Sequence, residues 1–437
     1  MTLFGKGQPG MLRSNVWIHA FLLIMFLNSF VACGTSQKAI KTHGTGFEFR
    51  EATLSRDIEK KGKDSIPIGQ SAVFYTNDTE VISRIKIADI SGKHKIRWDW
   101  HKPDGSLYMT TGSQTIKIPS GKFRKEMSVW HKITLYGEAA VDYPGRWLAN
   151  IYIDDSIVSS QHFEIKPEIN IDKLPKTART SNPNYWGLII GIENYAKLPA
   201  VDFAKKDAQL VHDYFKNLLG IPEKNIITLI DSEATKGKIE GILRSYLPLN
   251  LNESSWLYVY FAGHGAPSLK DGDAFIVTYD GEPRLIEYTG YKLETLYADI
   301  GNLPAKRSIV FIDGCFSGAS SRSDKMLIEG ARPALLKVKN QNFSSGNVIA
   351  MTASQGDQVS NAYPEKEHGL FTYYMLSGIR GAADADGDKM VTLDELYTYV
   401  NVNVVKVSRR AGLEQTPDIH PGIDAVKKIT VSEAVKE

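Results

Sequence analysis

The chain has 437 residues, of which 42% are hydrophobic, so it is long enough to fold into two domains with separate cores. Its 52 Lys and Arg residues nearly balance 50 Asp and Glu residues, and the formal net charge of +2 gives no reason to expect nucleic acid as a partner. Cys33 and Cys315 are its two cysteines, which excludes a disulfide framework once either has another role.

The N-terminus has the layout of a secretory signal. Lys6 and Arg13 precede an apolar stretch over residues 16–30, which leads through small residues to Cys33. A cysteine at this point resembles the bacterial lipobox, in which the thiol is diacylated, so we predict that residues 1–33 are a lipoprotein signal peptide and that Cys33 is lipidated. The alternatives are an ordinary signal peptide and an uncleaved anchor, although the apolar stretch is shorter than the roughly 20 residues of a spanning helix.

These features predict a protein that is exported and lipid-anchored to the bacterial cell envelope. Gly34, rather than aspartate, follows the lipidated cysteine, which favours the outer membrane if the envelope has two membranes. A membrane, reached through the lipid, is therefore one predicted partner.

Residues 46–169 have the alternating pattern of β-strands. Runs such as HKIRWDW and RWLANIYI alternate apolar with polar residues, and turn sequences such as Lys102-Pro103-Asp104-Gly105 separate them. Their spacing predicts an all-β, immunoglobulin-like (Ig-like) sandwich. This segment carries no catalytic constellation, so we expect it to act as a spacer or to dock a substrate or protein partner.

A proline-containing linker, predicted over residues 170–184, separates this domain from an α/β domain over residues 185–425. There, a strand near residues 187–192 is followed by apolar side chains at helical spacing over residues 210–218, with Asp202 expected as the helix cap. Strand and helix patterns alternate, which predicts a mostly parallel sheet flanked by helices.

Two apolar runs in this domain each end at glycine and a reactive side chain. WLYVYFAGHG delivers His264, and SIVFIDGCFSG delivers Cys315. Both runs are rich in β-branched and aromatic residues and predict buried strands. If these strands are parallel and adjacent, the thiol and the imidazole emerge together at the carboxyl edge of the sheet.

An imidazole beside a thiol favours the thiolate nucleophile and can protonate a leaving amine. We therefore predict Cys315 as the nucleophile, His264 as the general acid and base, and the backbone N–H groups of Gly265 and Cys315 as an oxyanion hole. Taken singly, a cysteine that packs as a small hydrophobic residue and a histidine at a loop end are the more common situations. Both together at glycine-flanked strand ends are much rarer, and their order, histidine before cysteine, is that of the caspases.

From about Tyr185 to about Gly422 the sequence resembles the caspase-like cysteine peptidases, closest to the bacterial metacaspase type. The resemblance rests on an ordered series of motifs, YWGLIIGIENY, KKDAQLVHDYF, YFAGHG, FIDGCFSG and HGLFTYYMLSGIRG. It implies a caspase-hemoglobinase fold and cleavage after basic residues. In metacaspases an aspartate two positions before the cysteine lines the specificity pocket, and Asp313 occupies that position. Asp207 matches a second pocket acid, although Lys206 replaces the asparagine that precedes it in the family.

Two carboxylates at the floor of one pocket would favour a guanidinium or ammonium group through charge-assisted hydrogen bonds. We therefore predict polypeptide substrates with basic residues, bound through Asp207 and Asp313. The alternatives are an exposed helical charge for Asp207 and a turn residue for Asp313.

The segment DADGDKMVTLDE has the ligand spacing of a calcium-binding loop, although Lys389 replaces the glycine that turns such a loop at its sixth position. The ligand positions are filled by Asp384, Asp386, Asp388, the Met390 carbonyl, Thr392 and Glu395. The alternative is an acidic loop before a helix, since Thr392 and Glu395 also form a capping box. Ca²⁺ is therefore retained as a candidate ligand, whereas the peptidase chemistry itself is expected to need no cofactor.

Together these patterns predict a cysteine endopeptidase that hydrolyses peptide bonds after Arg or Lys through a Cys315 thioester. The alternative is an envelope binding or signalling protein whose caspase-like domain is an inactive or conditionally active recognition module.

Overall fold

The computed structural model describes residues 37–38, 46–62, 64–175, 179–268, 273–316, 346–356 and 358–433. Residues Gly34–Glu437 form one compact unit, and the predicted signal peptide with Cys33 lies outside the described residues. Among the helices of the described ranges, none has both the length and the apolar character needed to cross a membrane.

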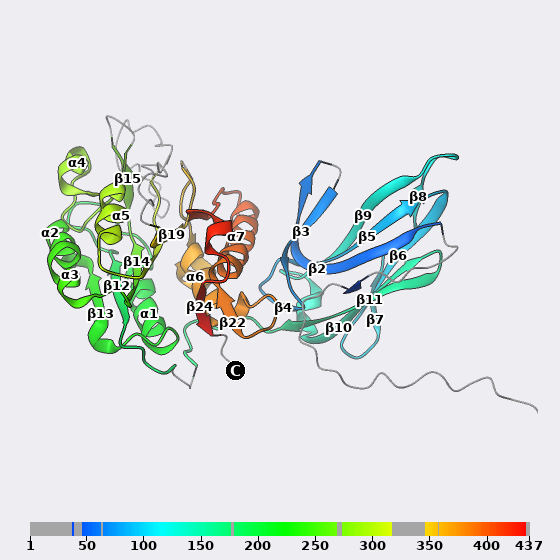
Figure 1. Cartoon of the computed structure of the whole chain (residues 1–437), viewed down its shortest axis with the longest axis horizontal. Coiled ribbons are helices and arrows are strands. Elements are labelled where there is room, and N and C mark those ends of the chain that lie inside the picture. The colour runs from blue at the N-terminus through cyan, green and yellow to red at the C-terminus, as the bar shows by residue number, and fades with distance from the viewer. Residues whose placement is uncertain are drawn as a thin grey trace, which may run out of the picture. The chain divides into compact units, whose positions relative to one another are not determined.

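The N-terminal part of the compact unit is built from strands (Figure 1). One sheet has the order β1-β2-β5-β9, with β3 paired to β2, and the other has the order β4-β11-β10-β6-β7, with β8 paired to β6. The first sheet comprises β1 (Gln37–Lys38), β2 (Glu48–Lys61), β3 (Asp64–Gln70), β5 (Glu80–Ile90) and β9 (Arg124–Thr134). The second comprises β4 (Val73–Tyr75), β6 (Lys93–His101), β7 (Leu107–Thr110), β8 (Gln114–Lys117), β10 (Gly145–Ile153) and β11 (Ser156–Lys166).

Side chains from both sheets share one hydrophobic core. The alternation seen in the sequence selects them, because successive side chains of a strand point to opposite faces. On β6, Ile96, Trp98 and Trp100 are buried while their neighbours are less so, and on β10 Trp147 and Ile151 are buried in the same way. The predicted strand-rich character of this region is thus observed.

The C-terminal part contains a six-stranded sheet in the order β13-β12-β14-β18-β19-β23. The first five strands are parallel, and β23 is antiparallel to β19. The strands are β12 (Tyr185–Gly191), β13 (Ile226–Ile230), β14 (Trp256–Ala262), β18 (Arg307–Asp313), β19 (Val348–Thr352) and β23 (Asp418–His420). The predicted α/β fold with a mostly parallel sheet is therefore confirmed.

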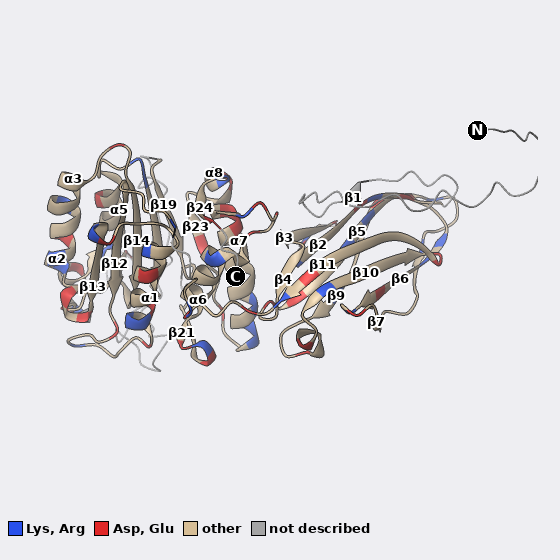
Figure 2. Cartoon of the chain, turned by 90° about the horizontal axis from the view of Figure 1, so that it is seen from below, with Lys and Arg blue, Asp and Glu red and all other residues tan. Residues whose placement is uncertain are grey.

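Helices and three small sheets surround this sheet (Figure 1). The helices are α1 (Ala204–Asn217), α2 (Lys236–Gly241), α3 (Leu247–Asn250), α4 (Ile286–Thr289), α5 (Leu293–Gly301), α6 (Leu370–Ser377), α7 (Leu393–Arg410) and α8 (Ile423–Val426). The small sheets pair β15 (Gly265–Pro267), β16 (Ala274–Ile276) and β17 (Tyr291–Lys292), β20 (Ala362–Tyr363) with β21 (His368–Gly369), and β22 (Met390–Thr392) with β24 (Thr430–Glu433). Charged side chains lie on the helices, whereas β12, β14 and β19 carry none, as Figure 2 shows. This distribution is typical of parallel strands covered on both faces.

Helix α1 begins differently from the prediction. Asp202 was the expected cap, but the residue before the helix is Phe203, which has the left-handed φ of 67° and gives no side-chain cap. The apolar stripe that follows is buried as expected, including Val211 and Phe215.

The two cores are joined by buried contacts. Ile169 and Ile171, which follow β11, pack into the core of the C-terminal part. Arg56 of β2 is 3% exposed, forms an ion pair with the buried Asp78 at 3.2 Å, and donates a hydrogen bond to the Ala382 carbonyl at 3.5 Å. Its guanidinium carbon also lies 5.3 Å from the centre of the Tyr399 ring, on α7.

We predict that Arg56→Met strongly destabilises the protein, because it leaves the Asp78 carboxylate buried without its cation. Removal of one partner of a buried ion pair costs about 3–5 kcal/mol. The matched control is Arg50→Met, since Arg50 is 45% exposed and pairs with Glu48 at the surface, where an ion pair contributes about 0–1 kcal/mol. Urea unfolding of both variants checks this, and equal midpoints would contradict it.

Candidate active site

The register of β14 and β18 brings the two reactive side chains to the same sheet edge. Ala262 pairs with Asp313 in the parallel ladder, and the N–H of Gly263 donates to the carbonyl of Asp313 at 3.2 Å. His264 and Cys315 each follow two positions beyond this pair. Both are buried, with 2% and 3% of their surface exposed.

The backbone segments that carry them are in contact. A Cβ added at Gly265 would lie 2.5 Å from the carbonyl oxygen of Cys315 and 2.6 Å from the Phe316 ring. A Cβ at Gly314 would lie 2.9 Å from the carbonyl oxygen of Gly263. Glycine is therefore required at 265 and 314 by the close approach of the two loops, which places the imidazole-bearing and thiol-bearing segments side by side.

The imidazole of His264 is oriented by a backbone carbonyl. Its Nε2 lies 2.9 Å from the carbonyl oxygen of Pro199. A carbonyl only accepts hydrogen bonds, so Nε2 carries a proton and Nδ1 is the basic nitrogen of the neutral ring. The Tyr195 ring lies against the same imidazole, with ring centroids 4.9 Å apart.

Gly265 also has a backbone N–H that the neighbouring strand does not engage. Residue Gly265 pairs with Ile276 in the antiparallel ladder of β15 and β16. The hydrogen bond of this ladder lies one pair away, where the N–H of Val277 donates to the His264 carbonyl at 2.9 Å. This pattern makes Gly265 a non-hydrogen-bonded position, so its N–H points away from β16. Such a group, beside Cys315, has the chemistry of an oxyanion donor.

Asp313 is the last residue of β18, and its buried carboxylate contacts the first turn of α6. Its Oδ1 accepts a hydrogen bond from the Ser360 hydroxyl at 2.5 Å. Its Oδ2 accepts from the Thr372 hydroxyl at 2.6 Å and the Thr372 N–H at 3.3 Å. Donors at a helix N-terminus stabilise a carboxylate, so the hydrogen bonds from Ser360 and Thr372 hold the Asp313 carboxylate in a fixed orientation.

Asp207 is buried as well and reaches the same segment. Its Oδ1 lies 2.5 Å from Nδ1 of the buried His368, and its Oδ2 accepts the Gly369 N–H at 2.8 Å. Nε2 of His368 in turn lies 3.3 Å from a carboxylate oxygen of Asp172. Both predicted pocket acids therefore converge on residues 368–372, with Asp207 also paired to an imidazole.

The acidic loop brings three of its six predicted ligands together. Single carboxylate oxygens of Asp384, Asp386 and Asp388 lie within 4.8 Å of one another. Lys389 takes the left-handed conformation, with φ 72°, that the loop position normally reserves for glycine. Glu395 is turned to the capping interactions instead, since it accepts hydrogen bonds from Thr392.

Burial raises the pKa of Asp384 and of Glu395. Met390 lies in β22 and Thr392 caps α7.

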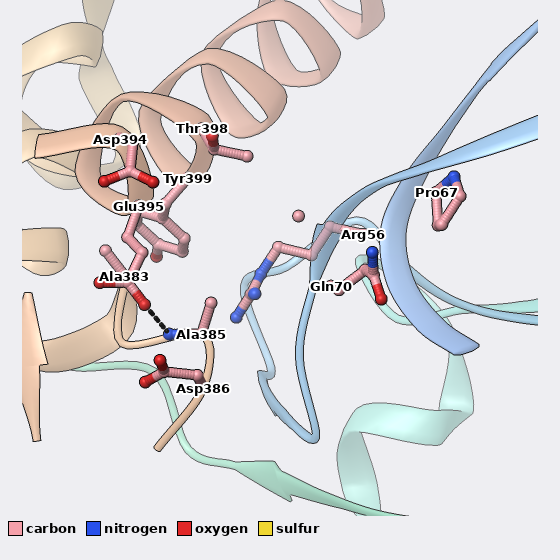
Figure 3. A pocket seen from close by; sticks show the side chains of 11 residues that line it. Arg56, Pro67, Gln70, Ala383, Ala385, Asp386, Asp394, Glu395, Thr398 and Tyr399 are labelled. Carbon is pink, nitrogen blue, oxygen red and sulfur yellow. Dashed lines mark hydrogen bonds between the residues drawn. The ribbon is translucent and has the colours of Figure 1, made fainter. Parts of the chain in front are cut away.

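A pocket of about 460 Å³ adjoins this loop, with Arg56 and Gln70 on one wall and Asp386 and Glu395 on the other (Figure 3). The Glu395 carboxylate also accepts the Ala385 N–H at 3.0 Å.

Several residues of the site had no distinctive sequence signal. The Pro199 carbonyl is a backbone group, whose role depends only on where the loop passes. Ser360, Thr372 and His368 contact the two acids from a segment that precedes or begins α6. Of these, His368 and Thr372 belong to a motif noted in the sequence, HGLFTYYMLSGIRG, whereas Ser360 lies outside it.

The match to a known family covers His264, Cys315 and both predicted pocket acids. The family model described as Peptidase_C14, caspase domain, matches residues 185–424, which is more than half of the chain. The protein therefore belongs to the caspase-domain family, as the motifs predicted. Comparison with curated protein sequences gives no match.

Solved structures with similarity to the chain include caspases. Caspase-1 from Spodoptera frugiperda is 15% identical, with 62% of this chain and 97% of that chain covered and a TM-score of 0.38. Its pro-form is 14% identical, with 61% and 97% covered and a TM-score of 0.38. An immunoglobulin-like protein from Pseudomonas aeruginosa, PA1606, is 11% identical, with 26% of this chain and 91% of that chain covered and a TM-score of 0.19.

We predict that Gly265→Ala destabilises the protein by about 1–3 kcal/mol, because the added methyl group meets backbone and ring atoms that cannot move freely. Gly237→Ala is the control, since a Cβ at this position of α2 meets nothing within 4 Å. The control should be neutral or slightly stabilising. Urea unfolding of the two variants checks the difference, and equal stability would mean that the two loops are not in contact.

Proposed function

We propose that the protein is a cysteine endopeptidase that hydrolyses peptide bonds after Arg or Lys. The observation that carries the proposal is the contact between the Gly265 position and the Cys315 carbonyl, because it places the imidazole-bearing and thiol-bearing segments side by side within a caspase domain. A thiol and a basic imidazole nitrogen in one buried site constitute a nucleophile and its general base.

In the proposed reaction, Nδ1 of His264 takes the Cys315 proton and the thiolate attacks the carbonyl carbon of the substrate. The backbone N–H groups of Gly265 and Cys315 hold the oxyanion. The imidazolium then gives its proton to the leaving amine, and a thioester remains on Cys315. Water, deprotonated by His264, hydrolyses the thioester and restores the thiol. The Pro199 carbonyl supports each step because it keeps the Nε2 proton in place.

Specificity for a basic side chain is assigned to Asp313. This carboxylate lies two positions before the nucleophile, is buried, and accepts hydrogen bonds from Ser360 and Thr372 that fix its orientation. A guanidinium group gains most from such a fixed carboxylate. Asp207 contributes negative charge to the same region, although its pairing with His368 makes it the weaker determinant.

The remaining features extend this proposal. Lipidation of Cys33 would anchor the enzyme to a bacterial cell envelope, at the outer membrane if there are two membranes. The two-sheet N-terminal part, with its single core, is compatible with an Ig-like sandwich that spaces the peptidase from the membrane or docks a protein partner. We assign the peptidase part to the metacaspase type on the position of Asp313.

Ca²⁺ is proposed as a ligand of the acidic loop. Asp384, Asp386 and Asp388 would hold it, because carboxylate oxygens are the ligands that this cation prefers and these three already lie close together. The Met390 carbonyl, Thr392 and Glu395 complete the expected set, with Glu395 released from its capping bonds. The cation would offset the mutual repulsion of the acids, and no step of peptide hydrolysis depends on it.

We predict turnover of fluorogenic peptides that end in Arg or Lys, and none of matched peptides that end in Asp, since two acidic groups repel a carboxylate. Cys315→Ala should abolish turnover, and parallel assays with Ca²⁺ added or chelated test the loop. Absence of turnover under all conditions, with binding of the basic peptides retained, would favour the alternative of a recognition module.

We predict that Asp313→Asn lowers kcat/KM for an Arg peptide at least 10-fold, because a hydrogen bond to a charged group contributes about 1.5–3 kcal/mol. The matched control is a peptide in which citrulline, a neutral group of the same shape, replaces Arg. Its kcat/KM should change little. If both peptides lose activity equally, Asp313 acts in folding or catalysis and not in specificity.

A further inference from the structure

Tyr195 lies against the face of the catalytic imidazole. It is in the loop that follows β12, its side chain is buried, and its ring centroid is 4.9 Å from that of His264, with the two planes inclined by 37°. An aromatic ring at this distance restricts the rotation of the imidazole. The negative face of the ring also favours the protonated form of His264, which the proposed thiolate–imidazolium pair requires.

The hydroxyl of Tyr195 is inserted into the backbone ladder that carries His264. In an antiparallel ladder a hydrogen-bonded pair exchanges two bonds. One bond of the His264 and Val277 pair is present, from the Val277 N–H to the His264 carbonyl at 2.9 Å. The second bond, from the His264 N–H to the Val277 carbonyl, is replaced by two hydrogen bonds of the tyrosine. The His264 N–H donates to the Tyr195 hydroxyl at 2.7 Å, and that hydroxyl donates to the Val277 carbonyl at 3.3 Å.

This insertion fixes the distance between His264 and β16. Without the hydroxyl, either the ladder closes directly and draws His264 toward Val277, or two buried backbone groups lose their partners. The first outcome moves the His264 backbone relative to Cys315, and the second removes the hydrogen bonds that hold the His264 backbone in place. A displacement of about 1 Å at a reacting group can cost about 10²-fold in rate.

The loop that carries Tyr195 is itself held at both sides. Oδ1 of Asp231 accepts the N–H groups of Glu193 and Asn194, each at 2.9 Å. On the other side of the tyrosine, the Ala196 N–H donates to the Tyr279 carbonyl at 3.2 Å. The backbone on both sides of Tyr195 is therefore held by hydrogen bonds to residues outside the loop.

We propose that Tyr195 is a positioning residue for the peptidase reaction, which holds His264 at the separation from Cys315 that the thiolate–imidazolium pair needs. The proposal rests on the proposed function, because it assigns His264 the role of base. In this role Tyr195 acts through His264, which it contacts with both its ring and its hydroxyl.

The test compares Tyr195→Phe, which removes only the hydroxyl, with Tyr195→Leu, which also removes the ring. A third variant, Gly263→Ala, displaces the Tyr195 hydroxyl without changing Tyr195 itself, because the added Cβ would lie 2.5 Å from the hydroxyl oxygen. Tyr288→Phe is the matched control, because Tyr288 is 73% exposed on α4. Full-length protein is used throughout.

Two readouts are measured as a function of pH. The first is kcat and KM with the Arg peptide. The second is the rate of Cys315 alkylation by iodoacetamide, followed by mass spectrometry of the peptide that contains Cys315, so that Cys33 does not contribute. The alkylation midpoint is the pH at which the rate of Cys315 alkylation reaches half of its maximum. It reports thiolate formation and does not depend on any substrate.

We expect Tyr195→Phe and Gly263→Ala to lower kcat about 10- to 100-fold with KM changed less than about threefold. In both, the alkylation midpoint should rise relative to that of the wild type, because the proposed thiolate–imidazolium pair is weakened. Tyr195→Leu should show the larger shift, and Tyr288→Phe should match the wild type. Tyr195→Phe with wild-type kcat and an unshifted midpoint would overturn the proposal, as would a uniform loss of rate with no shift, which reports partial unfolding alone.

The two hypotheses fail separately. If the wild type cleaves no peptide but its thiol midpoint is low and rises in Tyr195→Phe, the positioning role stands and the endopeptidase function is wrong. If the wild type cleaves Arg peptides and Tyr195→Phe is unchanged in both readouts, the function stands and the positioning role is wrong.

Discussion

The parallel pairing of β14 with β18 is the constraint on which the rest of the site depends. Because Ala262 pairs with Asp313 in the ladder, β14 and β18 end side by side at one edge of the sheet. The loops that carry His264 and Cys315 meet at this edge. The contact is so close that a Cβ at 265 would fall 2.5 Å from a backbone oxygen. The proposed base and nucleophile are thus placed by backbone register. The Pro199 carbonyl contacts the imidazole of His264, and the Tyr195 hydroxyl accepts its backbone N–H.

The N-terminus of α6 is the second organising element. Asp313 accepts the Thr372 N–H, and Asp207 accepts the N–H of Gly369, the residue that precedes α6. Both carboxylates therefore have hydrogen-bond donors that stabilise their charge before any substrate binds. In the proposed function, a basic side chain that enters this region would share the acids with these donors, and in the case of Asp207 with the His368 imidazole. The proposed recognition depends on the same two carboxylates that make these buried hydrogen bonds, so substitutions there require controls that separate binding from folding.

The sequence predicted what depends on local pattern. The spacing of apolar residues and the positions of glycines predict three features. These are the buried strands that end at Gly-His-Gly and Gly-Cys, the mostly parallel sheet, and the alternating strands of the N-terminal part. The sequence could not predict the residues that act through the backbone or from distant segments, such as Pro199 and Ser360, because their roles arise only when the loops pack. The cap of α1 was wrong because Phe203 adopts a left-handed conformation that composition does not reveal. The burial of Ile171 in the second core was likewise hidden, since a proline-containing stretch has the composition of a linker.

The central claim is that Cys315 is a nucleophile activated by His264 in a site that accepts a basic side chain. The most direct test is covalent labelling with an arginyl chloromethyl ketone and an aspartyl chloromethyl ketone, with the site of modification mapped by mass spectrometry. The account predicts rapid modification of Cys315 by the arginyl reagent, little by the aspartyl reagent, and loss of the rapid reaction in His264→Ala. Equal labelling by both reagents, or labelling that persists unchanged in His264→Ala, would contradict it.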